Sequence, residues 1–469
     1  MDAQVGALGR HIALVGFMGA GKSTAGREVA RLTERPFLDT DKEIERRHGP
    51  IEAIFDEHGE AEFRRIEEEV VAEALASDEP AVLALGGGAV TVEGNRERLA
   101  ARAFTVWIEV DVDVAWVRVR GSGRPLARDE GAFRELFERR AELYLAACDG
   151  IARDADGVLL EALGIVAEPG VLADLEWFAA GRPTALIADE RVLELHNPGL
   201  DGETHVVPSG EAAKRLDVVE TLWDELRIGR DGVVVALGGG TATDVAGFVA
   251  ATYLRGVAWV AVPTTLVGQV DAAIGGKTGI DLEGGKNLVG AFHLPESVVV
   301  DVEVLATLPE RERRQGMAEA VKTGLLAGQP LWELDDEQLV RACAAFKSAV
   351  VVSDPEEQGR RAILNLGHTF AHALEAASGY ELAHGDAVAL GLLAALRLSG
   401  QPTNVVEEVL RPEPVTVDRE AAWVALGRDK KARGGAPRLV LLEAPGKPVY
   451  GVELPKREVR AALDALIAG

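Results

Sequence analysis

The chain has 469 residues, 47% of them hydrophobic and 27% charged, and its formal net charge is −26. This length predicts two or three domains, and the acidic balance argues against nucleic acid or an anionic membrane as a partner. Its two cysteines, Cys148 and Cys343, are too few and too far apart for a disulfide framework or a cysteine metal site. The first residues lack a targeting signal and no stretch is apolar enough to span a bilayer, so we expect a protein of the reducing cytoplasm.

A phosphate-binding loop is the first motif along the chain. We expect a buried strand over residues 11–16 and a helix from about residue 22, with G-x-x-x-x-G-K-S between them. The glycines let backbone N–H groups turn toward phosphate oxygens, Lys22 reaches the β- and γ-phosphates, and Ser23 offers a hydroxyl to Mg²⁺. The sequence therefore predicts a nucleotide site made of Gly19, Ala20, Gly21, Lys22, Ser23 and Thr24.

Three later segments indicate where a phosphoryl acceptor binds. Asp39 and Asp41 end a strand that begins at Pro36, and alternate residues of a strand share a face. One carboxylate can steady the water shell of Mg²⁺ while the other takes a substrate hydroxyl. The triple glycine at 86–88 follows another strand and predicts close approach of the backbone to a ligand. The glycine-rich stretch 121–126 is expected to form a mobile lid with one arginine, Arg124.

Residues 10–164 together resemble shikimate kinase, through GFMGAGKST, LDTD, FRRIE, LGGGAV, GRPL and R-A-E-L-Y. The resemblance implies a P-loop α/β domain with a parallel sheet that phosphorylates shikimate with ATP. It implies that Ser23 and Asp39 act at Mg²⁺, that Arg124 closes over the transferred phosphate, and that Arg118 lies on the adenine side. The shikimate hydroxyls and carboxylate would be held by Asp41, Arg64, Gly86, Gly87, Gly88 and Arg140. Lys22, Asp41 and Arg124 would be the catalytic residues.

A change of pattern near residue 164 predicts a domain boundary. The stretch 164–183 interrupts the α/β rhythm with glycine and proline, so we expect a first domain over 1–164 and a linker over 165–182. An α/β domain that binds NAD is expected over 183–310, and a mainly helical domain that binds metal and substrate is expected over 311–469. The fold class is therefore α/β in the first two domains.

Glycine clusters dominate the first part of the second half. A buried strand over 232–237 runs into Gly238-Gly239-Gly240 and a helix, which is the arrangement of a dinucleotide phosphate site. Two further clusters surround Lys277 and Lys286. Such glycine-rich segments pack poorly as core and favour a surface that binds anions and a cofactor.

Histidines and one glutamate predict a metal site. His368 and His372 are four residues apart on an expected helix, His384 follows, and an upstream helix places Glu319 three residues before Lys322. One glutamate and two histidines form a ligand set of the catalytic zinc type. Taken alone, a pair of histidines at this spacing is explained equally well as two core or surface residues that form ordinary hydrogen bonds and bind no metal.

Residues 184–442 resemble 3-dehydroquinate synthase, through S-G-E-x-x-K, G-G-G-x-x-x-D, A-T-Y-x-R-G, P-T-T-L, Q-V-D, G-G-K-T-G, G-K-N, G-M-A-E-x-x-K, R-x-x-L-N-x-G-H-T and A-H-G. The resemblance implies zinc, or cobalt, on Glu319, His368 and His384. NAD would lie against Asp189, Glu211, Lys214, Gly239, Gly240, Asp244, Thr264 and Thr265. Substrate anions would be held by Arg255, Lys277, Lys286, Asn287, Lys322, Lys347, Arg361, Asn365 and, from the C-terminal domain, Lys430. Asp271 and His372 would act at the reacting carbons, with Lys277, Lys322 and Arg361 also catalytic.

The two resemblances together imply a bifunctional enzyme of the shikimate pathway. One half would phosphorylate shikimate with ATP and Mg²⁺. The other would cyclise 3-deoxy-D-arabino-heptulosonate 7-phosphate to 3-dehydroquinate with release of phosphate, using NAD⁺ and zinc or cobalt, as a homodimer through the synthase half. Two alternatives stay open at this point: the second half is a related sugar-phosphate cyclase or a polyol dehydrogenase, or one half is a binding module without catalysis.

Overall fold

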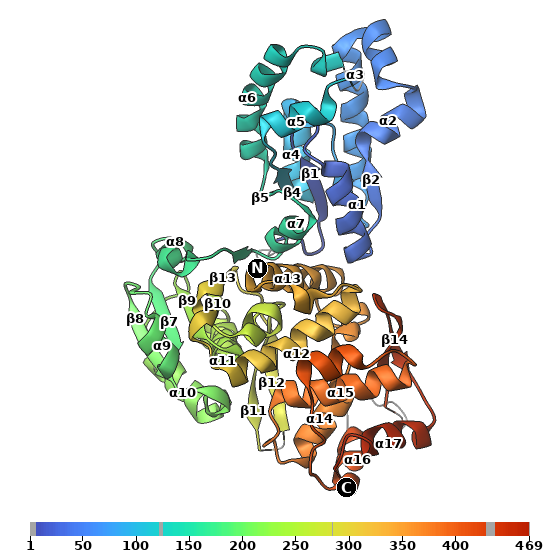
Figure 1. Cartoon of the computed structure of the whole chain (residues 1–469). Coiled ribbons are helices and arrows are strands. Elements are labelled where there is room, and N and C mark those ends of the chain that lie inside the picture. The colour runs from blue at the N-terminus through green and yellow to red at the C-terminus, as the bar shows by residue number, and fades with distance from the viewer. Residues whose placement is uncertain (1–5, 122–124, 284, 428–436, 469) are drawn as a thin grey trace. The chain divides into compact units, whose positions relative to one another are not determined.

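The chain forms two compact units. The computed structural model describes residues 6–121, 125–283, 285–427 and 437–468. One unit consists of residues 1–165 with 348–353, and the other of residues 166–347 with 354–469. Figure 1 shows the course of the chain through both units. Among the described helices, we find none with the length and apolar character needed to cross a bilayer.

The first unit is built on a parallel five-stranded sheet in the order β2-β3-β1-β4-β5. Helices cover the sheet, so its strands β1 and β3 are wholly buried and, apart from His11, apolar, as is usual for parallel sheets. The strands are β1 (His11–Val15), β2 (Phe37–Asp39), β3 (Val82–Ala84), β4 (Ala103–Ile108) and β5 (Gly150–Ala152). The segments that follow β1, β2 and β3 all begin at the carboxyl edge of this sheet, where ligands bind in open α/β folds.

Seven α-helices of the described residues complete this unit. The long helix α3 is kinked at Gly59, whose φ of 82° is outside the helical region. The apolar core between sheet and helices includes Phe17, Leu83 and Phe133. The helices are α1 (Lys22–Thr33), α2 (Thr40–His48), α3 (Ile51–Ala76), α4 (Glu93–Arg102), α5 (Val112–Val119), α6 (Glu130–Ala147) and α7 (Ala155–Glu161).

The second unit begins with a six-stranded sheet in the order β6-β13-β10-β9-β7-β8. Its described pairings are parallel, and β7 and β9 are buried along their whole length. The strands are β6 (Ile165–Ala167), β7 (Thr184–Asp189), β8 (Glu203–Val207), β9 (Val233–Gly238), β10 (Ala258–Pro263) and β13 (Ser297–Val300). A hairpin of β11 (Lys277–Leu282) and β12 (Gly285–Phe292) and a second of β14 (Leu439–Ala444) and β15 (Lys447–Val452) are antiparallel.

The segment 165–182, expected to be a linker, contributes to the second sheet instead. It contains β6, a 3₁₀ turn over Val171–Asp174 and the short helix α8 (Leu175–Ala179). Ile165, Val171 and Leu175 are buried. Their apolar side chains are thus part of a core, which the glycine and proline at the ends of the segment do not reveal.

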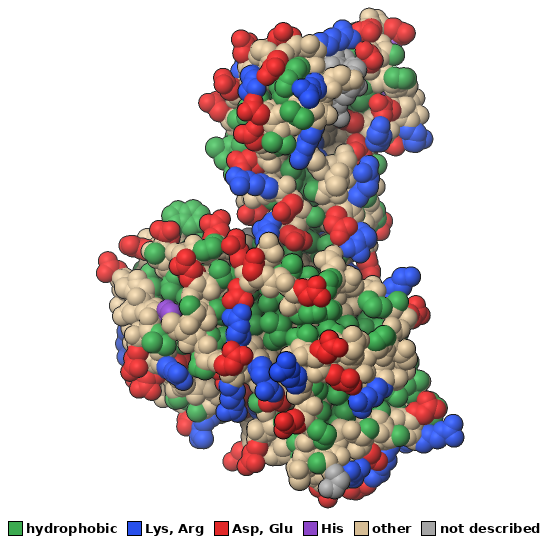
Figure 2. Space-filling model, viewed as in Figure 1, with side chains coloured by type: hydrophobic (Ala, Val, Ile, Leu, Met, Phe, Trp, Pro, Cys, Tyr) green, Lys and Arg blue, Asp and Glu red, His purple; other side chains and the backbone are tan. Residues whose placement is uncertain are grey.

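Helices form most of the remaining second unit. Helix α15 packs against α12 and α14, which brings segments far apart in sequence together (Figure 1). The helices are α9 (Glu190–His196), α10 (Leu216–Glu225), α11 (Gly240–Thr252), α12 (Glu310–Ala327), α13 (Asp336–Ser353, of which 348–353 belong to the first unit), α14 (His368–Ala377), α15 (His384–Leu398), α16 (Arg419–Gly427) and α17 (Lys456–Asp464). Figure 2 shows acidic and basic side chains interspersed over the visible face of each unit, and the acidic ones are in excess in the sequence.

Two candidate active sites

The loop between β1 and α1 has the shape of a phosphate cradle. Gly16, Gly19 and Gly21 have φ of 141°, 83° and 98°, a region that side chains other than glycine rarely adopt. A Cβ on Gly19 would lie 2.9 Å from the carbonyl oxygen of Ala115, so the space also requires glycine. Lys22 Nζ donates to the carbonyl oxygens of Gly16 at 2.8 Å and Phe17 at 3.1 Å, which folds the ammonium group back over the loop.

A hydroxyl and a carboxylate meet beside this loop. Ser23 Oγ donates to Asp39 Oδ2 at 2.5 Å, and Asp39 also caps α2 by accepting from the backbone N–H of Lys42 at 3.2 Å. Oxygen ligands of this kind suit Mg²⁺. Arg118 Nη1 donates to the carbonyl oxygen of Gly19 at 2.9 Å. A cavity of about 600 Å³ opens here, lined by residues that include Gly19, Ala20, Gly21, Lys22, Ser23, Thr24, Asp39, Asp41 and Arg118.

The triple glycine at 86–88 lies against charged side chains. A Cβ on Gly86 would lie 2.6 Å from Asp41 Oδ1 and would overlap Glu67, while a Cβ on Gly88 would overlap the guanidinium group of Arg64. The absence of side chains therefore leaves room for Asp41, Arg64 and Glu67 in one place.

Arg140 joins the same cluster from α6. Its Nη1 donates to the carbonyl oxygen of Gly87 at 3.1 Å, and the Tyr144 hydroxyl donates to the same oxygen at 2.5 Å. Burial lowers the pKa of Arg140, which nevertheless stays charged, because the pKa of an arginine is far above neutral pH. Within the described residues its Nε has no hydrogen-bond partner, so it is a buried donor available to a ligand.

Glu67 is a member of this cluster that the sequence did not single out. It is 0% exposed and forms an ion pair of 2.6 Å with Arg64, and burial raises its pKa. In the sequence it is one of many acids in a charged helix, and its spacing of three residues from Arg64 is the signal that could have identified it. Arg124, the expected lid residue, lies outside the described residues.

In the second unit, β7 and β9 end beside each other at a glycine turn. Gly239 caps the N-terminus of α11, where a Cβ would lie 3.0 Å from Thr265 Cγ2, and a Cβ on Gly240 would lie 2.9 Å from Ala272 Cβ. Asp189, the last residue of β7, accepts from Ser209 Oγ at 2.7 Å. Thr264 is buried and its Oγ1 has no partner among the described residues. A close-packed helix N-terminus with such groups around it suits a dinucleotide.

A network of charges lies next to α11. Lys214 Nζ donates to Asp244 Oδ2 at 2.7 Å and to Asn287 Oδ1 at 2.5 Å, and Lys286 forms an ion pair of 2.7 Å with Glu211. Burial alone would lower the pKa of Lys214, but Asp244 raises it overall. The structure thus brings these five expected binding residues together.

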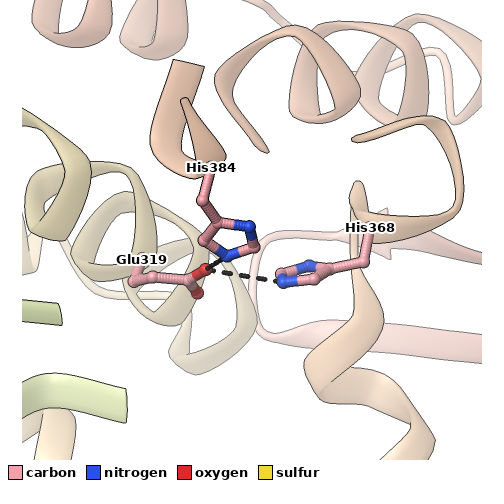
Figure 3. A group of neighbouring side chains, drawn as sticks. All are labelled: Glu319, His368 and His384. Carbon is pink, nitrogen blue, oxygen red and sulfur yellow. Dashed lines mark hydrogen bonds and ion pairs between the residues drawn. The ribbon is translucent and has the colours of Figure 1, made fainter. Parts of the chain in front are cut away.

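Glu319, His368 and His384 converge from three helices (Figure 3). Glu319 Oε1 lies 3.1 Å from His384 Nε2 and 3.4 Å from His368 Nε2, and one ligand atom from each residue lies within 4.8 Å of the others. Outer groups hold both rings, because His384 Nδ1 lies 3.0 Å from Glu375 Oε1 and His368 Nδ1 lies 3.3 Å from the carbonyl oxygen of Leu366. The donor set fits a divalent cation such as zinc.

The pKa of His384 depends on its acidic neighbours. Burial would lower its pKa, but hydrogen bonds with Glu319 and Glu375 raise the pKa to about 10. A metal ion bound here would take the place of that proton, since a histidine ligand must be neutral. His372 is exposed, and its ring lies edge-on to His368 with centroids 5.5 Å apart, so it borders the trio.

Buried charges surround Asp271, which lies in a single π-helical turn over Gly268–Ala272. Asp271 Oδ1 lies 2.5 Å from Lys347 Nζ, and its Oδ2 lies 3.9 Å from Lys322 Nζ, which also pairs with Glu319. Burial lowers the pKa of Lys347 to about 8. Arg361, 1% exposed, donates to the carbonyl oxygen of Gly275 at 2.9 Å.

Lys277 and Asn365 both contact Glu357, a residue that the sequence did not point to. Arg255 is exposed at the end of a 3₁₀ turn with φ of 69°, and among the described residues it forms no ion pair or hydrogen bond with this cluster. Lys430 lies outside the described residues.

Comparison with known proteins identifies the family. The profile of the shikimate kinase family matches residues 18–159, and those of the N- and C-terminal parts of 3-dehydroquinate synthase match residues 204–315 and 316–412. The bifunctional shikimate kinase/3-dehydroquinate synthase of Thermotoga maritima is 34% identical over 93% of this chain and 96% of its own length. The chain belongs to the bifunctional shikimate kinase/3-dehydroquinate synthase family. The expectations of an α/β fold and of an enzyme with both activities are therefore confirmed.

Single-activity relatives and solved structures resemble the synthase unit. The 3-dehydroquinate synthase of Symbiobacterium thermophilum is 39% identical over 71% of this bifunctional chain and 99% of its own length. A 2-deoxy-scyllo-inosose synthase, solved with carbaglucose-6-phosphate, NAD⁺ and Co²⁺, is 25% identical with a TM-score of 0.58 and covers 64% of this chain and 96% of its own. The 2-epi-5-epi-valiolone synthase of Streptomyces hygroscopicus, solved with NAD⁺ and Zn²⁺, is 26% identical with a TM-score of 0.57 and covers the same fractions.

Proposed function

We propose that the kinase unit transfers the γ-phosphoryl group of ATP to a hydroxyl of shikimate. The glycine loop and Lys22 bind the phosphates, and Ser23 and Asp39 hold Mg²⁺. Asp41, opposite the side-chain-free position of Gly86, accepts the proton of the attacking hydroxyl. Catalysis of this kind depends on positioning and on the neutralisation of charge.

Two arginines suit the carboxylate of shikimate. Arg64 and Arg140 approach the triple glycine from different helices, and Arg140 keeps a buried donor without a partner among the described residues. Arginine binds carboxylates through paired donors. Glu67 holds Arg64 in place through its ion pair. We assign adenine-side contact to Arg118, beside the phosphate loop, and closure over the phosphate to Arg124.

We propose that Glu319, His368 and His384 bind zinc or cobalt and that NAD⁺ lies along the N-terminus of α11. The metal supplies polarisation of a substrate hydroxyl, and NAD⁺ supplies a temporary hydride acceptor, when they are bound. The dinucleotide is held by Asp189, Glu211, Lys214, Gly239, Gly240, Asp244, Thr264 and Thr265.

The chain's own residues hold a doubly anionic sugar acid beside that metal. Its phosphate and carboxylate are bound by Arg255, Lys277, Lys286, Asn287, Lys347, Arg361, Asn365 and Lys430. Asp271 and His372 hold and move protons at the reacting carbons, and Lys322 fixes Glu319 through their buried ion pair. The binding of a flexible open-chain sugar in one geometry favours ring closure, because proximity replaces a large part of the entropic barrier.

The substrate of this unit is 3-deoxy-D-arabino-heptulosonate 7-phosphate, and its product is 3-dehydroquinate. The convergence of Glu319, His368 and His384 within 4.8 Å is the observation on which this proposal chiefly depends. One assay tests both units: the Lys22→Ala variant should lose ATP-dependent phosphorylation of shikimate and keep phosphate release from the heptulosonate phosphate. Removal of the divalent metal from the synthase unit by a chelator should abolish phosphate release from the heptulosonate phosphate. Synthase turnover that persists without divalent metal contradicts the assignment.

We further propose an NAD-binding domain over 183–310, a helical domain over 311–469, and a homodimer formed through the synthase unit in the cytoplasm. The cytoplasmic setting is supported by the two free cysteines, Cys148 and Cys343. Light scattering of the full chain during size-exclusion chromatography tests the dimer, since the mass of one chain is 49.7 kDa.

A further inference from the structure

Glu357 is an acidic residue among groups that are expected to bind substrate anions. One of its carboxylate oxygens forms an ion pair with Lys277, and the other accepts from Asn365 Nδ2 at 3.1 Å. Both oxygens are thus engaged by side chains that suit an oxyanion, and the Glu357 side chain is 16% exposed. Lys277 is 48% exposed, so a ligand can reach its ammonium group from solvent.

The backbone around Glu357 is held in a fixed, unusual turn. Glu357 has φ of 57°, a left-handed conformation that is uncommon outside glycine and is kept only where the surroundings impose it. The Asp354 carboxylate accepts from the backbone N–H groups of Gln358 at 2.9 Å, Gly359 at 2.8 Å and Arg361 at 2.9 Å. Arg361 Nη1 in turn donates to the carbonyl oxygen of Pro355 at 2.6 Å. The turn therefore directs the Glu357 carboxylate to Lys277 and Asn365.

We propose that the Glu357 carboxylate is an internal competitor for the phosphate group of the synthase ligand. In the free enzyme it pairs with Lys277 and Asn365. An arriving phosphate takes over these donors and displaces the carboxylate, and the carboxylate returns when phosphate leaves. This inference rests on the proposed synthase function, in which inorganic phosphate is a product.

The consequence is a lower affinity for phosphate than Lys277 and Asn365 could otherwise give. The charge of Lys277 is neutralised both in the free site, by Glu357, and in the occupied site, by phosphate. A phosphate that leaves meets a carboxylate ready to replace it, so product release does not leave an unpaired ammonium group. Removal of the charge of Glu357 should strengthen phosphate binding by roughly two- to fivefold, which is the range for a partly exposed ion pair.

The test is the competitive inhibition constant of inorganic phosphate against the heptulosonate phosphate, measured on the full chain with NAD⁺ and metal. Glu357→Gln keeps the shape of the side chain and should lower this constant roughly two- to fivefold. Glu356→Gln, a neighbouring exposed acid that accepts from Gln358, is the matched control and should leave it unchanged. In a Lys277→Ala background, the effect of Glu357→Gln on the affinity for inorganic phosphate, measured by calorimetry without turnover, should vanish, because the two act as a pair.

An unchanged or weaker inhibition by phosphate in Glu357→Gln would overturn the proposal, since general damage to the site weakens binding and does not tighten it. The absence of competitive inhibition in both wild type and Glu357→Gln would overturn it as well. Failure of the proposed function has a different signature: the wild-type chain itself would release no phosphate from the substrate.

Discussion

Substitution of Gly86 by alanine tests the shape of the kinase acceptor site. The φ of Gly86 is outside the left-handed region, so alanine meets no backbone barrier there. The new Cβ would lie 2.6 Å from Asp41 Oδ1, whereas an ordinary van der Waals contact is at least 3.4 Å. The Asp41 carboxylate must therefore shift by about 0.8 Å. It also meets Glu67, which is buried and paired with Arg64.

A displacement of this size matters because Asp41 is proposed to take the proton of the attacking hydroxyl. Misplacement by about 1 Å can lower a rate by about a hundredfold, so we expect kcat/KM for shikimate to fall by about ten- to a hundredfold. The KM for ATP should stay close to the wild-type value, since Gly86 is not in the phosphate loop. Steady-state release of ADP, with each substrate varied in turn, measures both quantities.

The control is Gly131→Ala at the start of α6, where a Cβ meets only the flexible Asp129 carboxylate at 3.3 Å. It should leave both kinetic constants unchanged. Thermal unfolding of the two variants separates catalysis from stability, because overpacking costs about 1 to 3 kcal/mol. Wild-type kinetics in a folded Gly86→Ala variant would refute the reasoning, and so would an equal loss for ATP and shikimate.

Three further predictions concern single groups. Ser23→Ala should lower kinase turnover at least about tenfold, because it removes one of the two side-chain oxygens proposed to hold Mg²⁺. High Mg²⁺ should restore part of the activity, and an unaltered Mg²⁺ dependence of ADP release would argue against this role of Ser23. Glu375→Gln should weaken metal binding by about ten- to a hundredfold in a chelator competition, since Glu375 holds His384, and unchanged affinity would remove Glu375 from the metal's outer shell. Lys347 has a pKa of about 8, so it is charged below that pH and loses its charge above it. Synthase kcat/KM should therefore decline as pH rises past 8, and Lys347→Arg should move the decline to higher pH; identical profiles would contradict the role of Lys347.

The sequence alone predicted those site residues that lie together in a single turn or helix. The phosphate loop is a single turn between β1 and α1, so its glycines and Lys22 could be read directly. The metal ligands lie on three helices; ligand chemistry suggested one glutamate with two of the histidines, and the resemblance to a family selected His368 and His384 as those two.

Residues whose role depends on packing between distant segments were missed. In the sequence Glu67 resembles a surface acid, yet helix α3 places its carboxylate next to Gly86. Glu375 is an acid in a mainly apolar helix, and its carboxylate contacts His384. Glu357 lies in an irregular turn without periodicity, so no pattern relates it to Lys277, which is 80 residues away. The strand β6 was missed because three residues are too few for an alternating pattern.

The most direct measurement follows phosphate and NADH together while the full chain, loaded with NAD⁺ and zinc, converts the heptulosonate phosphate. The account predicts steady release of phosphate without accumulation of NADH, and its loss in His384→Ala while that variant still phosphorylates shikimate. Accumulation of NADH in step with substrate consumption would contradict it, as would phosphate release by His384→Ala at the wild-type rate.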